Sequence, residues 1–153
     1  CADVDFVIAG AGVWRDAFAD EARARVERAG QHERIVFCGA VEDVPALLTQ
    51  GHVHVCPSIS PGDSFPNVIL DAKQAGLPSI VFPTAGLPEA VVSGVDGIVT
   101  AAPTADALSA AILDLLHDEP RRARMAAAAR ASLAAFDADV LTDQWLSLFL
   151  NRA

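Results

Sequence analysis

The stretch FPNVILDAKQAGLPSIVFP, residues 65–83, contains the two kinds of segment from which the fold can be predicted. As far as Gly76 it has the apolar spacing of a helix, and glycine is a typical helix end. The following LPSIVFP is a short apolar run without alternation, as expected of a strand that is buried on both faces. A helix followed closely by a buried strand is the repeating unit of a parallel sheet covered by helices.

The same pattern extends in both directions from this stretch. Further short apolar runs predict four more strands, in residues 5–12, 34–40, 52–58 and 97–101. Helical patterns separate the strands, in residues 14–30, 44–50 and 87–94. After Pro103 only helices follow, in residues 104–118, 119–136 and 137–150, the last with Asp137 as its cap. We therefore predict an α/β fold, a Rossmann-like three-layer domain with a parallel sheet of about five strands and extra carboxyl-terminal helices.

The composition is that of a soluble globular domain. Hydrophobic residues make up 52% and charged residues 20% of the chain, which argues against disorder. A chain of 153 residues is long enough to bury its own core, and we expect residues 1–153 to form a single domain. No apolar run approaches the roughly eighteen residues needed to span a bilayer, and no basic face indicates contact with a membrane.

Charge and cysteine content restrict the expected partners and location. A chain with 20 acidic and 11 basic residues would repel the backbone of a nucleic acid, so nucleic acid is not an expected partner. The cysteines Cys1, Cys38 and Cys56 have neither the spacing of a zinc site nor the density of a secreted disulfide scaffold. The chain opens on a strand-like segment with no resemblance to a signal peptide, and we expect a cytoplasmic protein with reduced thiols.

Asp63 and Asp71 flank the start of the helix in residues 65–76, at the sheet edge where ligands of such folds bind. Asp63 precedes a helix predicted to begin near Phe65 or Pro66, where an acid is also a common cap. Asp71 is an unfavourable residue in the interior of an apolar helix. Together, two carboxylates could accept hydrogen bonds from the hydroxyl groups of a sugar. Two interpretations therefore stay open: a cap and a surface charge, or two halves of one ligand site.

Residues 57–125, from PSISPGDSFPNVILDAKQAG to LLHDEPRRARM, resemble the carboxyl-terminal domain of the family-4 retaining glycosyltransferases, also called glycosyl transferases group 1, which have the two-domain GT-B architecture. The resemblance continues upstream through RIVFCGAVEDVPALL to FVIAGAG and downstream to FDADVLTDQWLSLF, so it covers essentially the whole chain. At its centre the family has two glutamates separated by seven residues, where this chain has Asp63 and Asp71.

The resemblance implies a glycosyltransferase whose donor substrate is a nucleoside diphosphate sugar. In the family the first acid meets hydroxyls of the donor sugar, which would make Asp63 the catalytic carboxylate. The second acid holds the ribose hydroxyls, which is the role implied for Asp71. The resemblance implies that neither a metal nor another cofactor takes part.

Backbone groups complete the implied site. Those of Phe65, Pro66 and Asn67 would lie against the sugar and the phosphates at a helix N-terminus, which is a natural site for anions. By the same resemblance, the segment from Gly39 to Val41 would line the nucleobase.

The chain departs from the family pattern in three respects. Both acids are aspartates, one methylene shorter than glutamate, and Pro66 replaces a glycine and so removes one backbone donor. The arginine and lysine that neutralise the diphosphate in the family would lie upstream of residue 1. We therefore expect a fragment of a two-domain enzyme whose amino-terminal domain holds the acceptor, and we expect the isolated fragment to be inactive.

Two other functions stay open at this point. A sugar-nucleotide epimerase of similar architecture would differ from a transferase only in its products. A flavodoxin-like interaction domain without a substrate is the non-enzymatic alternative. A receiver domain of that kind would need acids after its early strands and a late lysine, which FVIAGAG and GIVTA do not supply.

Three charged or polar residues near the pair have simpler interpretations. Lys73, two positions after Asp71, is expected on nearly the opposite side of the helix and in contact with solvent. His52 and His54 share one face of a strand, but a metal site needs at least one more ligand, so no metal is expected.

Two apolar or turn-rich segments complete the predictions. TAGLPEAV, residues 84–91, has the proline and the acid of a capped helix start, with a wall of the ligand pocket as the alternative. In the last helix we expect Trp145 to be largely buried against the domain body, together with Leu146 and Phe149.

Overall fold

A computed structural model describes residues 4–10, 16–62 and 64–150. The chain divides into two compact units, Cys1–Val44 and Pro45–Ala153.

The first unit is built on two parallel strands joined through a helix. β1 (Phe6–Ala9) pairs with β2 (Ile35–Gly39), and α1 (Asp16–Arg28) lies between them in the sequence. The ladder is irregular at its end, where Ala9 pairs with Gly39 and the amide of Gly10 donates to the Gly39 carbonyl at 2.7 Å. Gly39 has φ 67°, a left-handed conformation that glycine adopts without strain.

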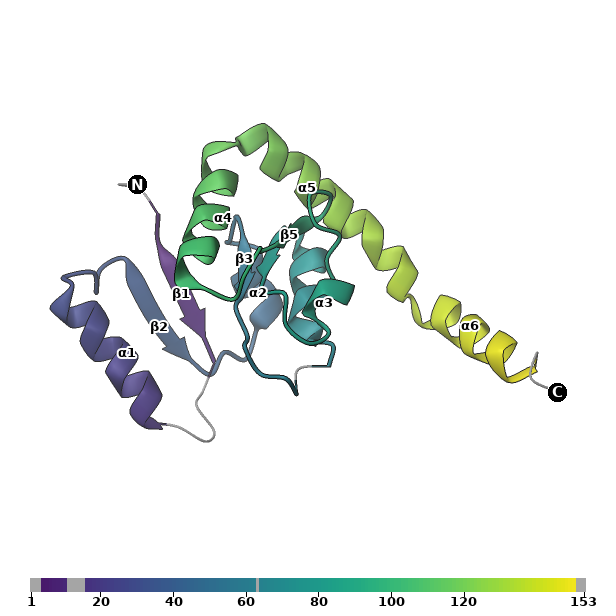
Figure 1. Cartoon of the computed structure of the whole chain (residues 1–153), viewed down its shortest axis with the longest axis horizontal. Helices are drawn as coiled ribbons and strands as arrows, with labels where there is room; N and C mark the ends of the chain where they lie inside the picture. The colour runs from purple at the N-terminus through teal and green to yellow at the C-terminus, as the bar shows by residue number, and fades with distance from the viewer. Residues whose placement is uncertain (1–3, 11–15, 63, 151–153) are drawn as a thin grey trace. The chain divides into compact units, whose positions relative to one another are not determined.

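The second unit contains a three-stranded parallel sheet (Figure 1). Its order is β3 (His54–Cys56), β4 (Ser79–Val81) and β5 (Gly97–Val99), so that β4 is central. The register places His54 beside Ser79, and Ser79 beside Gly97. The remaining elements are α2 (Val44–Leu48), α3 (Asn67–Ala75), η1 (Leu87–Glu89), α4 (Ala105–His117), α5 (Glu119–Ser132), η2 (Leu133–Phe136) and α6 (Ala138–Leu150).

The core of the second unit lies on both faces of β4. Val81 belongs to a buried cluster with Ile69 of α3, whereas Ile80 belongs to a second cluster with Leu115 of α4 and Met125 of α5. Successive side chains of a strand point to opposite faces, so β4 is covered by helices on both sides. This is the layered arrangement that the apolar run in residues 77–83 predicts.

The predicted α/β class and the five parallel strands are confirmed, but the strands do not form one sheet. Among the described residues they form a two-stranded and a three-stranded sheet. An apolar run predicts a strand, but it does not show which strand lies beside it, because pairing depends on residues far apart in the sequence.

The helices α4 and α6 begin with side-chain caps. Thr104 Oγ1 accepts a hydrogen bond from the Ala107 amide at 3.3 Å at the start of α4. At the start of α6, Asp137 Oδ1 accepts from the Asp139 amide at 2.9 Å, so the predicted cap is confirmed.

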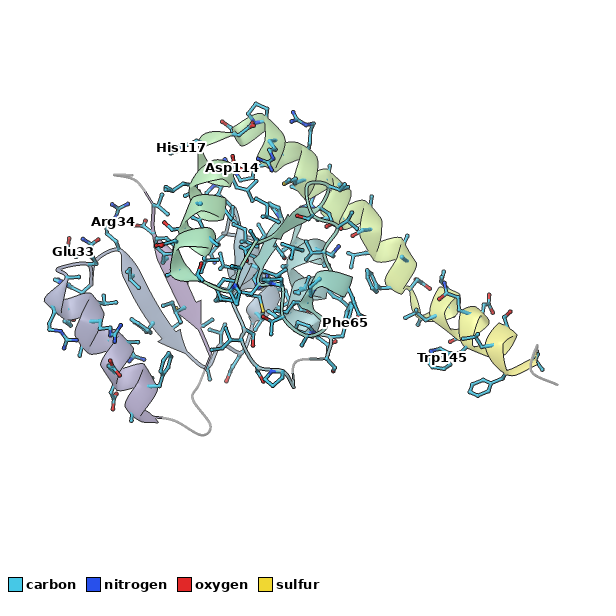
Figure 2. All side chains as sticks on the ribbon, in the orientation of Figure 1. Glu33, Arg34, Phe65, Asp114, His117 and Trp145 are labelled. Carbon is cyan, nitrogen blue, oxygen red and sulfur yellow. The ribbon has the colours of Figure 1, made fainter. Side chains whose placement is uncertain are left out.

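The predicted burial of Trp145 is wrong. Its side chain is 60% exposed, and Leu146 and Phe149 are exposed as well. In Figure 2 Trp145 projects from α6, a helix that extends away from the sheet of its unit. The helix contacts η2, and Trp145 stacks only on its neighbour Phe149, at 5.9 Å between ring centroids. Helical spacing identifies an apolar face, but it does not supply the surface that would cover it. Across the described ranges, no helix is long and apolar enough to cross a membrane.

Candidate functional site

Two loops meet at the carboxyl edge of the three-stranded sheet, where ligands bind in folds of this class. One loop leads from β3 to α3 and the other from β4 to η1. A Cβ atom at Gly86, in the second loop, would lie 1.3 Å from the Ser64 carbonyl oxygen in the first. Gly86 therefore allows the two backbones to approach more closely than any other residue would. In residues 84–91 a short helix, η1, follows Gly86, with a proline and Glu89 in its first turn but without a side-chain cap; the alternative, a wall of the ligand pocket, stays a prediction.

The start of α3 has backbone donors without an acceptor in the part of the chain that the structure describes. Pro66 is in extended conformation at the N-cap (φ −76°, ψ 117°) and provides no side-chain cap, and the helix begins at Asn67. The predicted start near Phe65 or Pro66 is thus early by one or two residues, because Pro66 precedes the first helical turn. The amides of Asn67 and Val68 find no acceptor among the described residues. Such a helix start attracts anions.

Asp71 lies in the second turn of α3 and is partly buried. Its carboxylate makes no hydrogen bond or ion pair to another described residue. Its charge acts on His54 of β3, whose pKa it raises. A partly buried carboxylate with free acceptor sites is suited to hold hydroxyl groups of a ligand.

His54 is kept neutral beside this carboxylate. Burial lowers the pKa of His54 from 6.5 to about 4, although the charge of Asp71 acts in the opposite direction. The Nδ1 atom of His54 lies 3.0 Å from Ser79 Oγ on the paired strand β4. The sequence pattern placed His54 on a strand, but its proximity to Asp71 depends on how α3 packs on β3.

The prediction that Lys73 contacts solvent is wrong, because its side chain is buried. It is 2% exposed, and its ammonium lies 2.5 Å from Asp96 Oδ2 and 2.7 Å from Ser132 Oγ. The face of α3 opposite Asp71 is the core face, which carries Ile69, Ala72 and Lys73. The spacing i, i+3, i+4 from Ile69 is the signal that could have identified Lys73 as buried.

The predicted site residues fall into three groups. Phe65, Pro66, Asn67 and Asp71 are close in sequence and belong to the second unit, at the start of α3. Gly39 and Val41 belong to the first unit, at and after the end of β2. Asp63 lies outside the described residues. Within the described ranges, no group of three potential metal ligands is present.

A sequence model of the glycosyl transferases group 1 matches residues 1–118, which is most of the 153-residue chain. The chain belongs to this family. Two curated relatives of this glycosyltransferase illustrate the match. The glycogen synthase of Mycobacterium tuberculosis is 36% identical over 129 residues, which are 82% of this chain and 30% of that protein. The phosphatidyl-myo-inositol mannosyltransferase of Mycobacterium leprae is 28% identical over 149 residues, which are 96% of this chain and 38% of that protein.

A solved structure has the same fold as this glycosyltransferase. Anabaena Alr3699/HepE in complex with UDP-glucose matches with a TM-score of 0.84 and 25% identity, over 100% of this chain and 42% of that chain. The likeness confirms the predicted membership of the GT-B glycosyltransferases. The chain thus spans less than half the length of each of these three proteins.

Proposed function

We propose that this chain is the donor-binding domain of a retaining glycosyltransferase and binds a nucleoside diphosphate sugar. The observation that carries the proposal is the free carboxylate of Asp71 on the same helix whose N-terminal amides have no acceptor among the described residues. A carboxylate accepts hydrogen bonds from hydroxyl groups, and a helix N-terminus attracts phosphate. A similar structure, Anabaena Alr3699/HepE, is known in complex with UDP-glucose.

The residues of the second unit would divide the donor between them. Asp71 would accept hydrogen bonds from the ribose hydroxyls, and Asp63 from hydroxyls of the transferred sugar. The amide of Asn67 would donate to a phosphate oxygen, while Phe65 and Pro66 would shape the backbone beside the sugar. Pro66 has no amide hydrogen, so the phosphate would depend on the first amides of α3.

Gly39 and Val41 would line the nucleobase. Gly39 ends β2 in a left-handed conformation, and Val41 follows it in the loop towards α2. A short side chain at such a strand end leaves room for a flat ring. This assignment rests on the family resemblance.

The chemistry requires stabilisation of the departing diphosphate. In transfer, the bond between the anomeric carbon and the diphosphate oxygen breaks, and the acceptor oxygen forms the new bond with retained configuration. The proton of the acceptor hydroxyl passes to the departing diphosphate. The N-terminus of α3 would stabilise the charge that develops on the leaving group. The acceptor site would lie in an amino-terminal domain of a longer protein, and the positively charged residues that complete the neutralisation would lie upstream of residue 1.

Calorimetry with UDP and UDP-glucose tests the site. Asp71→Asn should weaken the binding of both ligands by about 1.5 to 3 kcal/mol, because it removes the charged acceptor of the ribose hydroxyls. Asp63→Asn should weaken the binding of UDP-glucose and leave the binding of UDP unchanged. Asp143→Asn removes the same charge from the exposed helix α6 and is the matched control, with unchanged affinities.

Equal affinity of wild type and Asp71→Asn for both ligands would contradict the assignment. Where this chain alone binds too weakly to quantify, the same variants are measured in the longer protein with its amino-terminal domain. Product analysis there separates transfer to an acceptor from epimerisation of the sugar nucleotide.

A further inference from the structure

A short segment before α3 is enclosed from two sides. The segment Ser64–Pro66 joins the loop after β3 to the first free amides of α3. On one side the Ser64 carbonyl lies against Gly86. On the other side Phe65 packs on the core cluster around Ile69 and Val81. Figure 2 shows Phe65 beside α3.

Phe65 also touches an aromatic ring from a distant part of the chain. The ring of Phe136, the last residue of η2, lies 5.5 Å from the Phe65 ring, centroid to centroid, at an interplanar angle of 46°. Aromatic pairs in this range of distances contribute about 0.5 to 1.5 kcal/mol beyond the area that they bury. The segment is therefore held by a residue 71 positions later in the sequence, the difference between 65 and 136.

Phe136 is itself in contact with the buried side chain of Lys73. The ammonium of Lys73 lies 5.9 Å from the centre of the Phe136 ring, within the range of a cation–π contact. The same ammonium is bound by Asp96 and by Ser132 Oγ, and Ser132 Oγ in turn donates to the Ala129 carbonyl at 2.7 Å. These contacts connect η2 and its terminal ring to α3.

We propose that Phe136 is a positioning residue for donor binding: its ring holds Phe65, and thereby the Ser64–Pro66 segment, so that the first amides of α3 face the diphosphate. The proposal rests on the proposed function, because it assigns Phe136 a part in the same donor site. Phe136 does not contact the donor itself. A purely structural role would make Phe136 equivalent to any other core side chain of similar size.

Hydrogen exchange without ligand tests the positioning step. In Phe136→Ala, amides in residues 58–66 should exchange about 3- to 10-fold faster than in wild type, the factor that loss of one aromatic pair implies. Phe136→Tyr keeps the ring and should restore wild-type exchange. Met125→Ala truncates a buried side chain in the cluster on the other face of β4, and should leave exchange in 58–66 within twofold of wild type.

Calorimetry with UDP-glucose on the same proteins tests the functional step. The Kd should rise about 3- to 10-fold in Phe136→Ala, and should stay within twofold in Phe136→Tyr and Met125→Ala. Should Phe136→Ala not fold, Phe136→Leu removes the ring and keeps most of the apolar volume, and the same two shifts are expected.

The outcomes separate the inference from the proposed function. Unchanged exchange in residues 58–66 of the folded ring-less variant would overturn the inference, whatever the ligand. Faster exchange with an unchanged Kd would overturn the role in donor binding. An equal rise of Kd in Met125→Ala would overturn it as well, because the effect would then be general destabilisation. If wild type binds neither UDP-glucose nor a second probe, GDP-mannose, the result would count against the proposed function and thus against the donor-binding role of Phe136. The exchange measurement would still decide whether Phe136 holds the Ser64–Pro66 segment.

Discussion

The ammonium of Lys73 lies 2.5 Å from Asp96 Oδ2, and both side chains are only 2% exposed. The other oxygen of this carboxylate, Oδ1, accepts a hydrogen bond from the Val92 amide at 2.8 Å. The pair thus connects α3 to the segment before β5, inside the unit that carries the predicted donor residues.

Removing one partner of this pair should strongly destabilise the fold. Lys73→Met leaves the Asp96 charge buried without its ammonium, and the free energy of unfolding should fall by about 3 to 5 kcal/mol. Urea denaturation measures the loss. Asp114→Asn breaks the more exposed ion pair with Arg121 and should cost less than about 1 kcal/mol. A loss below 1 kcal/mol for Lys73→Met would show that the pair contributes little.

The neutral state of His54 should make stability depend on pH. The pKa of His54 is about 4 in the folded chain and 6.5 in the unfolded chain, so the unfolded chain binds the extra proton between these values. The contribution is fully present above pH 6.5 and is lost as the pH falls towards 4. It amounts to at most about 3 kcal/mol, from 1.36 kcal/mol for each pKa unit.

His54→Gln should remove this contribution. The difference in unfolding free energy between wild type and His54→Gln, measured by denaturation from pH 7 to pH 4, should shrink as the pH falls. His52→Gln replaces the exposed histidine two residues earlier and should keep the wild-type pH profile. A constant difference for His54→Gln over the whole range would contradict the prediction.

A side chain at Gly86 should disrupt the contact between the two loops. A Cβ atom there would lie 1.3 Å from the Ser64 carbonyl oxygen, so one backbone must move. Gly86→Ala should therefore lower the free energy of unfolding by about 1 to 3 kcal/mol, as in other overpacked sites. Gly62→Ala is the matched variant, since its Cβ atom would meet nothing closer than Ser60 Oγ at 3.6 Å. Thermal unfolding of the two variants tests the prediction. Equal unfolding midpoints for Gly86→Ala and Gly62→Ala would show that the two loops can move apart without loss of stability.

Ala85 should be replaceable by glycine with a gain in stability. It has φ 48°, and among the described residues it is the only one other than glycine with positive φ. The left-handed conformation costs an L-residue about 1 to 2 kcal/mol, which glycine avoids. Glycine also increases the conformational entropy of the unfolded chain, and this lowers stability by about 0.4 to 1 kcal/mol. Ala85→Gly should therefore stabilise by about 0.5 to 1 kcal/mol in urea denaturation. Ala127→Gly, in the exposed interior of α5, should instead destabilise by about 1 kcal/mol.

The exposed tryptophan of α6 should contribute little to the stability of this chain. Trp145→Ala removes a side chain that touches only its helical neighbour Phe149 among the aromatic rings, so the free energy of unfolding should change by less than about 0.5 kcal/mol. Met125→Ala, in the buried cluster, should cost about 2 to 5 kcal/mol. A large loss for Trp145→Ala in denaturation experiments would show that α6 is covered in solution.

The sequence by itself determined the local elements and the family. The helix that begins near Pro66, the buried strand β4 and the cap at Asp137 each follow from neighbouring residues, because helix periodicity, strand apolarity and capping are local interactions. The resemblance of residues 57–125 to the group 1 glycosyltransferases implied the family, and the match of the family model over residues 1–118 confirmed it.

Only the tertiary structure decided which distant residues meet. Lys73 is buried because Asp96 lies against it from 23 positions away, and Phe65 meets Phe136 at the end of η2. The same holds for the division of the strands into two sheets and for the exposure of Trp145. A local pattern indicates that a residue is apolar or needs a polar partner, but it does not identify the partner. The partner is determined by how whole helices and strands pack, and the free energy of that packing depends on contacts between segments that are distant in the sequence.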